Sequence, residues 1–194
     1  AGAGGGEAMT INVPQASGGA MAEDGAAWRG MLRVFGETLA ESMRRGVVLS
    51  IENLHVTHGQ PSDSTRQFGV LPEECLAWVR SVRDCLGYTR VGFHLDIGHA
   101  RNNPPFSKRL CVSHWYALTG RALTGMHLHQ VVSIEGVGMK NHYPFDGPWG
   151  PLISLSSLFW AWRVGQVNRV AMFIEVRPPA TGWEVRDRLA DRKR

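Results

Sequence analysis

The 194-residue sequence lacks most features that mark secreted, membrane-spanning or metal-finger proteins. Its three cysteines form no CxxC pair and no Cys/His finger spacing, which argues against a disulfide framework and a structural zinc site. No apolar run approaches the roughly 20 residues of a membrane-spanning helix, and the opening residues lack the basic start and apolar stretch of a secretory signal. We therefore expect a cytoplasmic protein whose cysteines are reduced and packed as small apolar residues.

The charge excess is small and points to no particular partner. The formal net charge is +4, and much of it comes from the run at 186–194 and from scattered arginines. The chain has no RGG run and no basic stripe interleaved with aromatic residues, so a solvated surface explains the charge better than nucleic acid binding. With 43% hydrophobic residues, it is long enough for one substantial core, and we expect a single domain over residues 1–194.

Strand-like and helix-like stretches alternate along the chain, which is typical of parallel β/α units. Short apolar runs predict strands at 10–13, 47–52, 91–96, 126–129 and 170–175. Apolar residues at helical spacing predict helices at 24–45, 72–86, 107–118, 153–166 and 183–192, with a loop at 98–105. A closed (β/α)8 barrel needs eight strands and typically about 250 residues. The expected fold is therefore an α/β TIM-type barrel that is partial, with about five β/α units and the N-terminal units missing.

Two further segments carry specific expectations. Residues 130–149 contain three glycines and two prolines that break both helix and strand periodicity, which predicts a loop over the mouth of the barrel. His142 and Lys140 in this loop are expected to face the substrate, with Lys140 placed to meet an anionic group. In the helix predicted at 107–118, His114, Trp115 and Tyr116 are expected to be packing residues.

Four of the predicted strands carry, at or near their ends, a residue that can bind a divalent metal. Side chains at the carboxyl ends of parallel barrel strands converge on one pocket, so residues far apart in sequence can share one ion. The sequence therefore predicts a metal site built from Glu52, Asp96, His127 and Glu175.

The same segments resemble the successive metal-site motifs of the xylose isomerase-like TIM barrels. The runs are IEN at 51–53, LDIGHA at 95–100, GMHLH at 125–129 and FIEVR at 173–177, and the resemblance covers about residues 10–180. That superfamily holds sugar and sugar-phosphate isomerases and epimerases as well as apurinic/apyrimidinic endonucleases of the endonuclease IV type. Resemblance to the carbohydrate enzymes implies a small sugar or sugar-derived substrate and is compatible with a homo-oligomer.

The resemblance implies roles for individual residues. One divalent metal, Mn²⁺ or Mg²⁺ with Co²⁺, Fe²⁺ or Zn²⁺ as substitutes, would be held by the four predicted ligands. Glu52 and Glu175 would exchange a proton at the carbon next to the substrate carbonyl through an enediolate. His99 would contact substrate oxygens or a further metal. His129 lies on the same strand face as His127 and is either a substrate contact or the alternative ligand.

The endonuclease alternative meets one departure from its pattern. Those enzymes use a three-zinc cluster that includes a D-x-H pair, whereas the matching stretch here reads KNH at 140–142. Because a lysine would repel zinc, the sequence favours a one-metal carbohydrate enzyme. An endonuclease IV-like phosphodiesterase or a non-catalytic relative remains the alternative.

Overall fold

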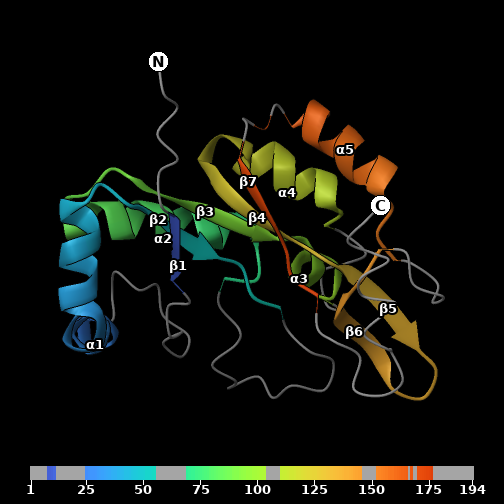
Figure 1. Ribbon diagram of the computed structural model, residues 1–194, viewed down its shortest axis with the longest axis horizontal. Helices are drawn as coiled ribbons and strands as arrows, with labels where there is room; N and C mark the ends of the chain where they lie inside the picture. The colour runs from blue at the N-terminus through green and yellow to red at the C-terminus, as the bar shows by residue number, and fades with distance from the viewer. Residues whose placement is uncertain are drawn as a thin grey trace, which may run out of the picture.

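The protein was analysed as a computed structural model that describes residues 8–11, 25–55, 69–103, 110–145, 152–165, 167 and 170–176. Its framework is a five-stranded sheet in the order β1-β2-β3-β4-β7, accompanied by a separate two-stranded sheet, β5-β6 (Figure 1). All four strand pairs of the larger sheet are parallel. The predicted succession of five parallel strands is therefore confirmed.

The strands of the larger sheet lie within three residues of their predicted bounds. They are β1 (Ala8–Ile11), β2 (Val48–Glu52), β3 (Val91–Asp96), β4 (Leu123–Leu128) and β7 (Ala171–Ile174). Every residue of the central strand β3 is buried. That burial is typical of a parallel strand covered on both faces. Asp96, the last residue of this strand, is therefore buried as well.

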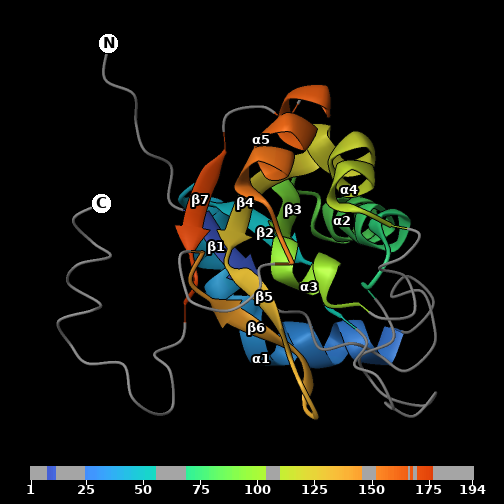
Figure 2. The ribbon, with the colours of Figure 1, turned by 90° about the vertical axis from the view of Figure 1, so that its right-hand side faces the viewer.

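Helices cover one side of this sheet. Figure 2 shows α2 (Pro72–Leu86), α4 (Val112–Thr119) and α5 (Leu155–Val164) on the same side, while α1 (Gly25–Arg44) lies below. Helix α2 begins at its predicted proline and ends at Gly87, which has φ 60° and donates its backbone N–H to carbonyls of the last turn. A short 3-10 turn, η2 (Gly120–Ala122), leads from α4 into β4.

The prediction of a loop at 130–149 is wrong for its described part. Residues 130–143 form an antiparallel hairpin of β5 (Gln130–Ile134) and β6 (Gly138–Tyr143). Gly136 has φ 72° and Gly138 has φ 94°, the positive values that tight hairpin turns require. These glycines mark the turn between two strands instead of breaking them.

Two helical predictions need correction. A five-residue helix, α3 (Ile97–Arg101), begins directly after β3 where the sequence predicts a loop. Asp96 caps it by accepting a hydrogen bond from the backbone of His99, which is a common way to begin a helix. In the helix predicted at 107–118, residues 110 and 111 are not helical, and α4 begins at Val112. Residues 107–109 and the helix predicted at 183–192 lie outside the described residues.

The core confirms some packing predictions and contradicts others. Trp115 and Tyr116 are fully buried under the sheet, as expected, but His114 on the same helix is exposed. Of the reduced cysteines, Cys75 is buried as predicted, whereas Cys85 and Cys111 are exposed. Neighbouring side chains on a helix lie about 100° apart, so on α4 His114 can face solvent while Trp115 faces the core. Among the described helices, none combines the length and apolar character needed to cross a membrane.

Candidate functional site

The four predicted ligands meet at the carboxyl ends of the parallel strands. Glu52 and Asp96 are the last residues of β2 and β3, and Asp96 lies beside His127 of β4 in the strand register. Glu175 follows β7, and its backbone N–H continues the ladder by donating to Leu128 at 3.1 Å. The structure thus brings together residues that are up to 123 positions apart, as the strand topology predicts.

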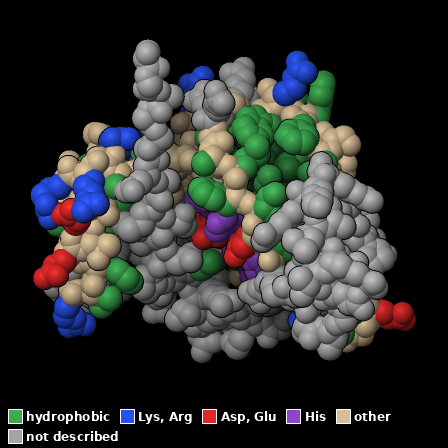
Figure 3. All heavy atoms as spheres, viewed as in Figure 1, with side chains coloured by type: hydrophobic (Ala, Val, Ile, Leu, Met, Phe, Trp, Pro, Cys, Tyr) green, Lys and Arg blue, Asp and Glu red, His purple; other side chains and the backbone are tan. Residues whose placement is uncertain are grey.

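One imidazole nitrogen lies at the centre of this group. His127 Nδ1 is 3.1 Å from Glu52 Oε1, 3.2 Å from Glu175 Oε2 and 3.6 Å from Asp96 Oδ2. Asp96 and Glu52 are buried, whereas the side chain of Glu175 is 44% exposed. In Figure 3, histidine and acidic side chains gather near the middle of the visible face. The site is therefore a partly open pocket with three carboxylates around one nitrogen.

The charges of this centre stabilise one another. Hydrogen bonds to Asp96 and then Glu52, assisted by the nearby Glu175, raise the pKa of His127 to about 10 against the effect of burial. Burial opposes ionisation of Asp96, but the histidines at 99, 127 and 129 outweigh it and hold its carboxyl pKa well below the usual range. The carboxylates gathered here thus stabilise a positive charge at the position of His127 Nδ1.

Asp96 is held from several directions at once. Its Oδ1 accepts the His99 backbone N–H at 2.7 Å, and His129 Nε2 lies 2.9 Å and 3.1 Å from its two oxygens. The side-chain amide of Asn53 donates to the Asp96 carbonyl at 3.0 Å and accepts the Asp96 N–H at 2.8 Å. Asn53 thereby extends the pairing of β2 with β3 by one residue. Asn53 follows Glu52 directly in the IEN run, but no pattern in the sequence marks it as a residue that positions Asp96.

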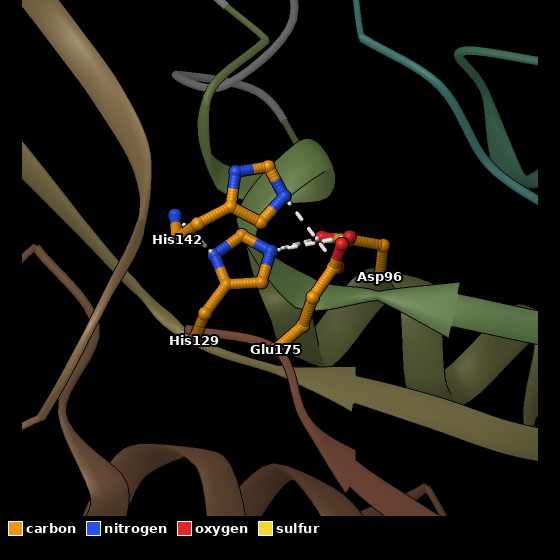
Figure 4. A group of neighbouring side chains, drawn as sticks. All are labelled: Asp96, His129, His142 and Glu175. Carbon is orange, nitrogen blue, oxygen red and sulfur yellow. Dashed lines mark hydrogen bonds and ion pairs between the residues drawn. The ribbon is translucent and has the colours of Figure 1, made fainter. Parts of the chain in front are cut away.

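A second group of possible ligands shares Asp96 with the first. Asp96, His129, His142 and Glu175 each offer an atom within 4.8 Å of the others, as Figure 4 shows. His142 Nε2 lies 3.4 Å from Glu175 Oε2, and the rings of His129 and His142 stack with centroids 4.4 Å apart. The hairpin that replaces the predicted loop therefore carries His142 into the site. Lys140, two residues earlier on β6, is exposed, and its anion-binding role stays a prediction.

The hydrogen bonds assign protons to two of the histidines. His129 Nδ1 accepts the backbone N–H of His142 at 3.0 Å, so in the neutral ring Nε2 carries the proton and donates it to Asp96. His99 Nδ1 lies 2.9 Å from the Asn53 carbonyl, to which it donates, and this leaves Nε2 as an acceptor. His55 lies beside this ring, with centroids 4.7 Å apart.

Two glycines make room for these imidazoles. A Cβ at Gly98 would lie 1.7 Å from His129 Cε1, and a Cβ at Gly125 would lie 2.7 Å from His94 Nδ1. His94 itself is buried in the sheet, with its ring centroid 4.2 Å from that of His127. The role of these two glycines could not be predicted from the sequence, because it depends on side chains from neighbouring strands.

Comparisons with known proteins agree on the fold. The sequence matches no family model and no curated protein. Among solved structures, the chain is similar to a provisionally named xylose isomerase from Rhodospirillum rubrum, with 21% identity and a TM-score of 0.63 over 95% of this chain and 58% of that one. It is similar to the 3-keto-D-glucoside 4-epimerase YcjR from E. coli, with 15% identity and a TM-score of 0.55 over 97% of this chain and 64% of that one.

A D-tagatose 3-epimerase-like protein gives the same result, with 14% identity and a TM-score of 0.52 over 96% of this chain and 60% of that one. The chain thus spans about three fifths of the length of the structures that it matches. At these identities the likeness concerns the fold and not the chemistry. The chain has the fold of the xylose isomerase-like TIM barrels, in the form of a partial barrel.

Proposed function

We propose that this protein is a divalent-metal-dependent isomerase or epimerase of a sugar or sugar-derived substrate. The observation that carries the proposal is the approach of three carboxylates, Glu52, Asp96 and Glu175, to the single nitrogen His127 Nδ1 within 3.6 Å. The solved structures of similar fold bear the names of sugar isomerases and epimerases, which supports a carbohydrate substrate over DNA. The endonuclease alternative is retained as one arm of the test.

The donor set fits a hard divalent cation. Three carboxylates and one imidazole are ligands that suit Mn²⁺ or Mg²⁺, with Co²⁺, Fe²⁺ or Zn²⁺ as possible substitutes. We assign the imidazole to His127, because three carboxylates surround its Nδ1, and a bound ion would take the place of the proton that this nitrogen carries. The proton on His129 Nε2 is donated to Asp96, and its Nδ1 accepts a backbone N–H. In this assignment His129 orients Asp96. The bound ion would polarise neighbouring oxygens of the substrate.

The protein's own residues would carry the proton transfer. Glu52 and Glu175 reach the same nitrogen from different strands, so both can face one substrate. One would remove the proton from the carbon next to the carbonyl, and the other would return a proton to it. His99, through its acceptor Nε2, and His142 are placed to bind substrate hydroxyl groups, and the exposed Lys140 would meet an anionic substituent.

Metal content tests the ligand assignment. Glu175→Gln keeps the side-chain size but removes the charge, and we expect it to weaken Mn²⁺ binding by at least ~10-fold, the lower end of what outer partners of metal ligands contribute. Glu37→Gln, at an exposed position of α1, is the matched control and should leave binding unchanged. His127→Gln should weaken binding more than His129→Gln. The reverse order would transfer the ligand role to His129, and equal metal content in wild type and Glu175→Gln would refute the site.

Activity is tested with a panel of ketoses in D₂O and, in parallel, with DNA containing an abasic site. Incorporation of solvent deuterium at the carbon next to the carbonyl supports the isomerase or epimerase. Strand cleavage without deuterium exchange would instead support the phosphodiesterase. For any charged substrate, Lys140→Ala should raise KM, and an unchanged KM would remove Lys140 from the site.

A further inference from the structure

A second reactive cluster lies at the start of α4, on side chains that the carboxylate centre does not use. Cys111 is the N-cap residue of α4, and its Sγ lies 2.7 Å from Ser113 Oγ and 3.0 Å from His114 Nδ1. The thiol is exposed, so reagents in solution can reach it. A thiol beside an imidazole at the beginning of a helix is an arrangement that favours the thiolate, which is the nucleophilic form.

The surroundings of the sulfur make this ionisation possible at neutral pH. Partial burial opposes it, but the hydrogen bonds with Ser113 and His114 outweigh burial and lower the pKa of Cys111 to about 7. Cys75 shows the opposite effect, since complete burial raises the pKa of its thiol well above the usual range. Exposure alone does not single out Cys111, because Cys85 on α2 is also exposed.

The cluster opens onto a pocket of about 680 Å³ between the start of α4 and residues 152–161, which include the first turns of α5. Cys111 and Ser113 form one wall, and Ser154, Leu158 and Trp160 belong to the other. Arg101 also belongs to the lining, where its Nε donates to the carbonyl of Leu152 at 3.3 Å, and it brings a positive charge to this side of the pocket. None of the residues that line the pocket belongs to the carboxylate centre. The pocket is therefore suited to a small, anionic molecule that presents a group able to react with sulfur.

We propose that Cys111 is a site of thiol–disulfide exchange with a small carboxylate-bearing disulfide, such as glutathione disulfide, which the pocket seats against Arg101. The Cys111 proton passes to His114, and the thiolate attacks one sulfur of the disulfide. A new sulfur–sulfur bond to Cys111 forms as the original one breaks, and the departing thiolate takes a proton from His114 or water. One thiol and one disulfide thus give one mixed disulfide and one thiol, with no other oxidant required.

The first test uses the unmodified chain as its own control. Wild-type protein is incubated with glutathione disulfide at pH 7, and peptide mass mapping follows the modification of Cys111 and Cys85 over time. About half of Cys111 is ionised at this pH against a few per cent of an ordinary thiol, but a thiolate of lower pKa is also a weaker nucleophile. The net expectation is that Cys111 reacts at least ~3-fold faster than Cys85. Equal rates in the native chain, or a preference that persists in denaturant, would refute the proposal.

The second test separates the cluster from the pocket. His114→Gln should slow exchange at Cys111 and leave exchange at Cys85 unchanged, with thermal unfolding of both proteins as the folding control. Arg101→Gln should slow the reaction with glutathione disulfide relative to the uncharged 2-hydroxyethyl disulfide, whereas Arg101→Lys, which retains the charge, should preserve the ratio. If Arg101→Gln leaves this ratio unchanged, the pocket does not select the anionic disulfide and the proposal fails.

Discussion

Replacing Gly98 by alanine tests whether close packing of one glycine holds the site together. Gly98 lies in α3, two residues after Asp96, and a Cβ built on it would lie 1.7 Å from His129 Cε1 and 2.4 Å from Nδ1. Real Cβ atoms essentially never approach another heavy atom closer than 3.0 Å. The His129 ring would therefore have to move by more than an ångström, away from the carboxylate that it contacts at 2.9 Å.

The expected cost follows from these contacts. Forcing extra volume into a packed core costs about 1–3 kcal/mol. Loss of a hydrogen bond to a charged group adds about 1.5–3 kcal/mol. We expect Gly98→Ala to lower the free energy of unfolding by about 2–5 kcal/mol, since these two losses partly overlap. Gly36→Ala on α1 is the matched control, because nothing lies within 4 Å of its Cβ position, and it should stabilise the protein by about 0.5–1 kcal/mol.

Urea denaturation followed by circular dichroism measures both variants. A double variant, Gly98→Ala with His129→Ala, makes the test specific, because removing the ring gives the new methyl group space. The two substitutions should then cost at least ~1 kcal/mol less together than the sum of their separate costs. If Gly98→Ala is as stable as the wild type, or if the two effects simply add, Gly98 is not needed to make room for the His129 ring.

Three further outcomes are expected. Burial, with a smaller effect of the charge on His127, lowers the pKa of His94 to about 4 from its usual 6.5. As the pH falls, the unfolded chain therefore binds a proton at His94 before the folded protein does. The folded protein loses stability between pH 6.5 and 4 for this reason. Between pH 7.5 and 5 the wild type should lose about 2 kcal/mol more in urea denaturation than His94→Phe, and equal losses would contradict this origin. Asn53→Ala leaves the N–H and carbonyl of Asp96 without their side-chain partner and should cost about 2–4 kcal/mol in the same assay, whereas a loss below about 1 kcal/mol would show that solvent replaces it. Ile174, 78% exposed on the edge strand β7, should promote self-association, so Ile174→Lys should shift sedimentation velocity profiles toward the monomer, and identical profiles would place the contact elsewhere.

The sequence alone was sufficient for the five parallel strands, for the helices α1, α2 and α5, and for the edge of the sheet that carries the site. Parallel strands end at a common edge, so Glu52, Asp96 and Glu175 could be placed together from apolar runs and the residues that follow them. The hairpin at 130–143 was missed because Gly136 and Gly138 have the same composition signal in a loop and in a tight turn. Such glycines mark a hairpin turn only if the flanking segments pair as strands, and the sequence does not show whether they do.

The arrangement within the site was decided only by the tertiary structure. The alternation of side chains puts His127 and His129 on one face of the strand, but it does not say which nitrogen approaches which oxygen. That choice depends on the strand register, including a shift between Phe93 and His94, and on the hairpin that brings the His142 backbone to His129. Apolar periodicity and turn residues reflect interactions between residues that are close in sequence, so the sequence predicts them. A hydrogen bond between residues 33 positions apart depends on how whole strands pack, to within an ångström.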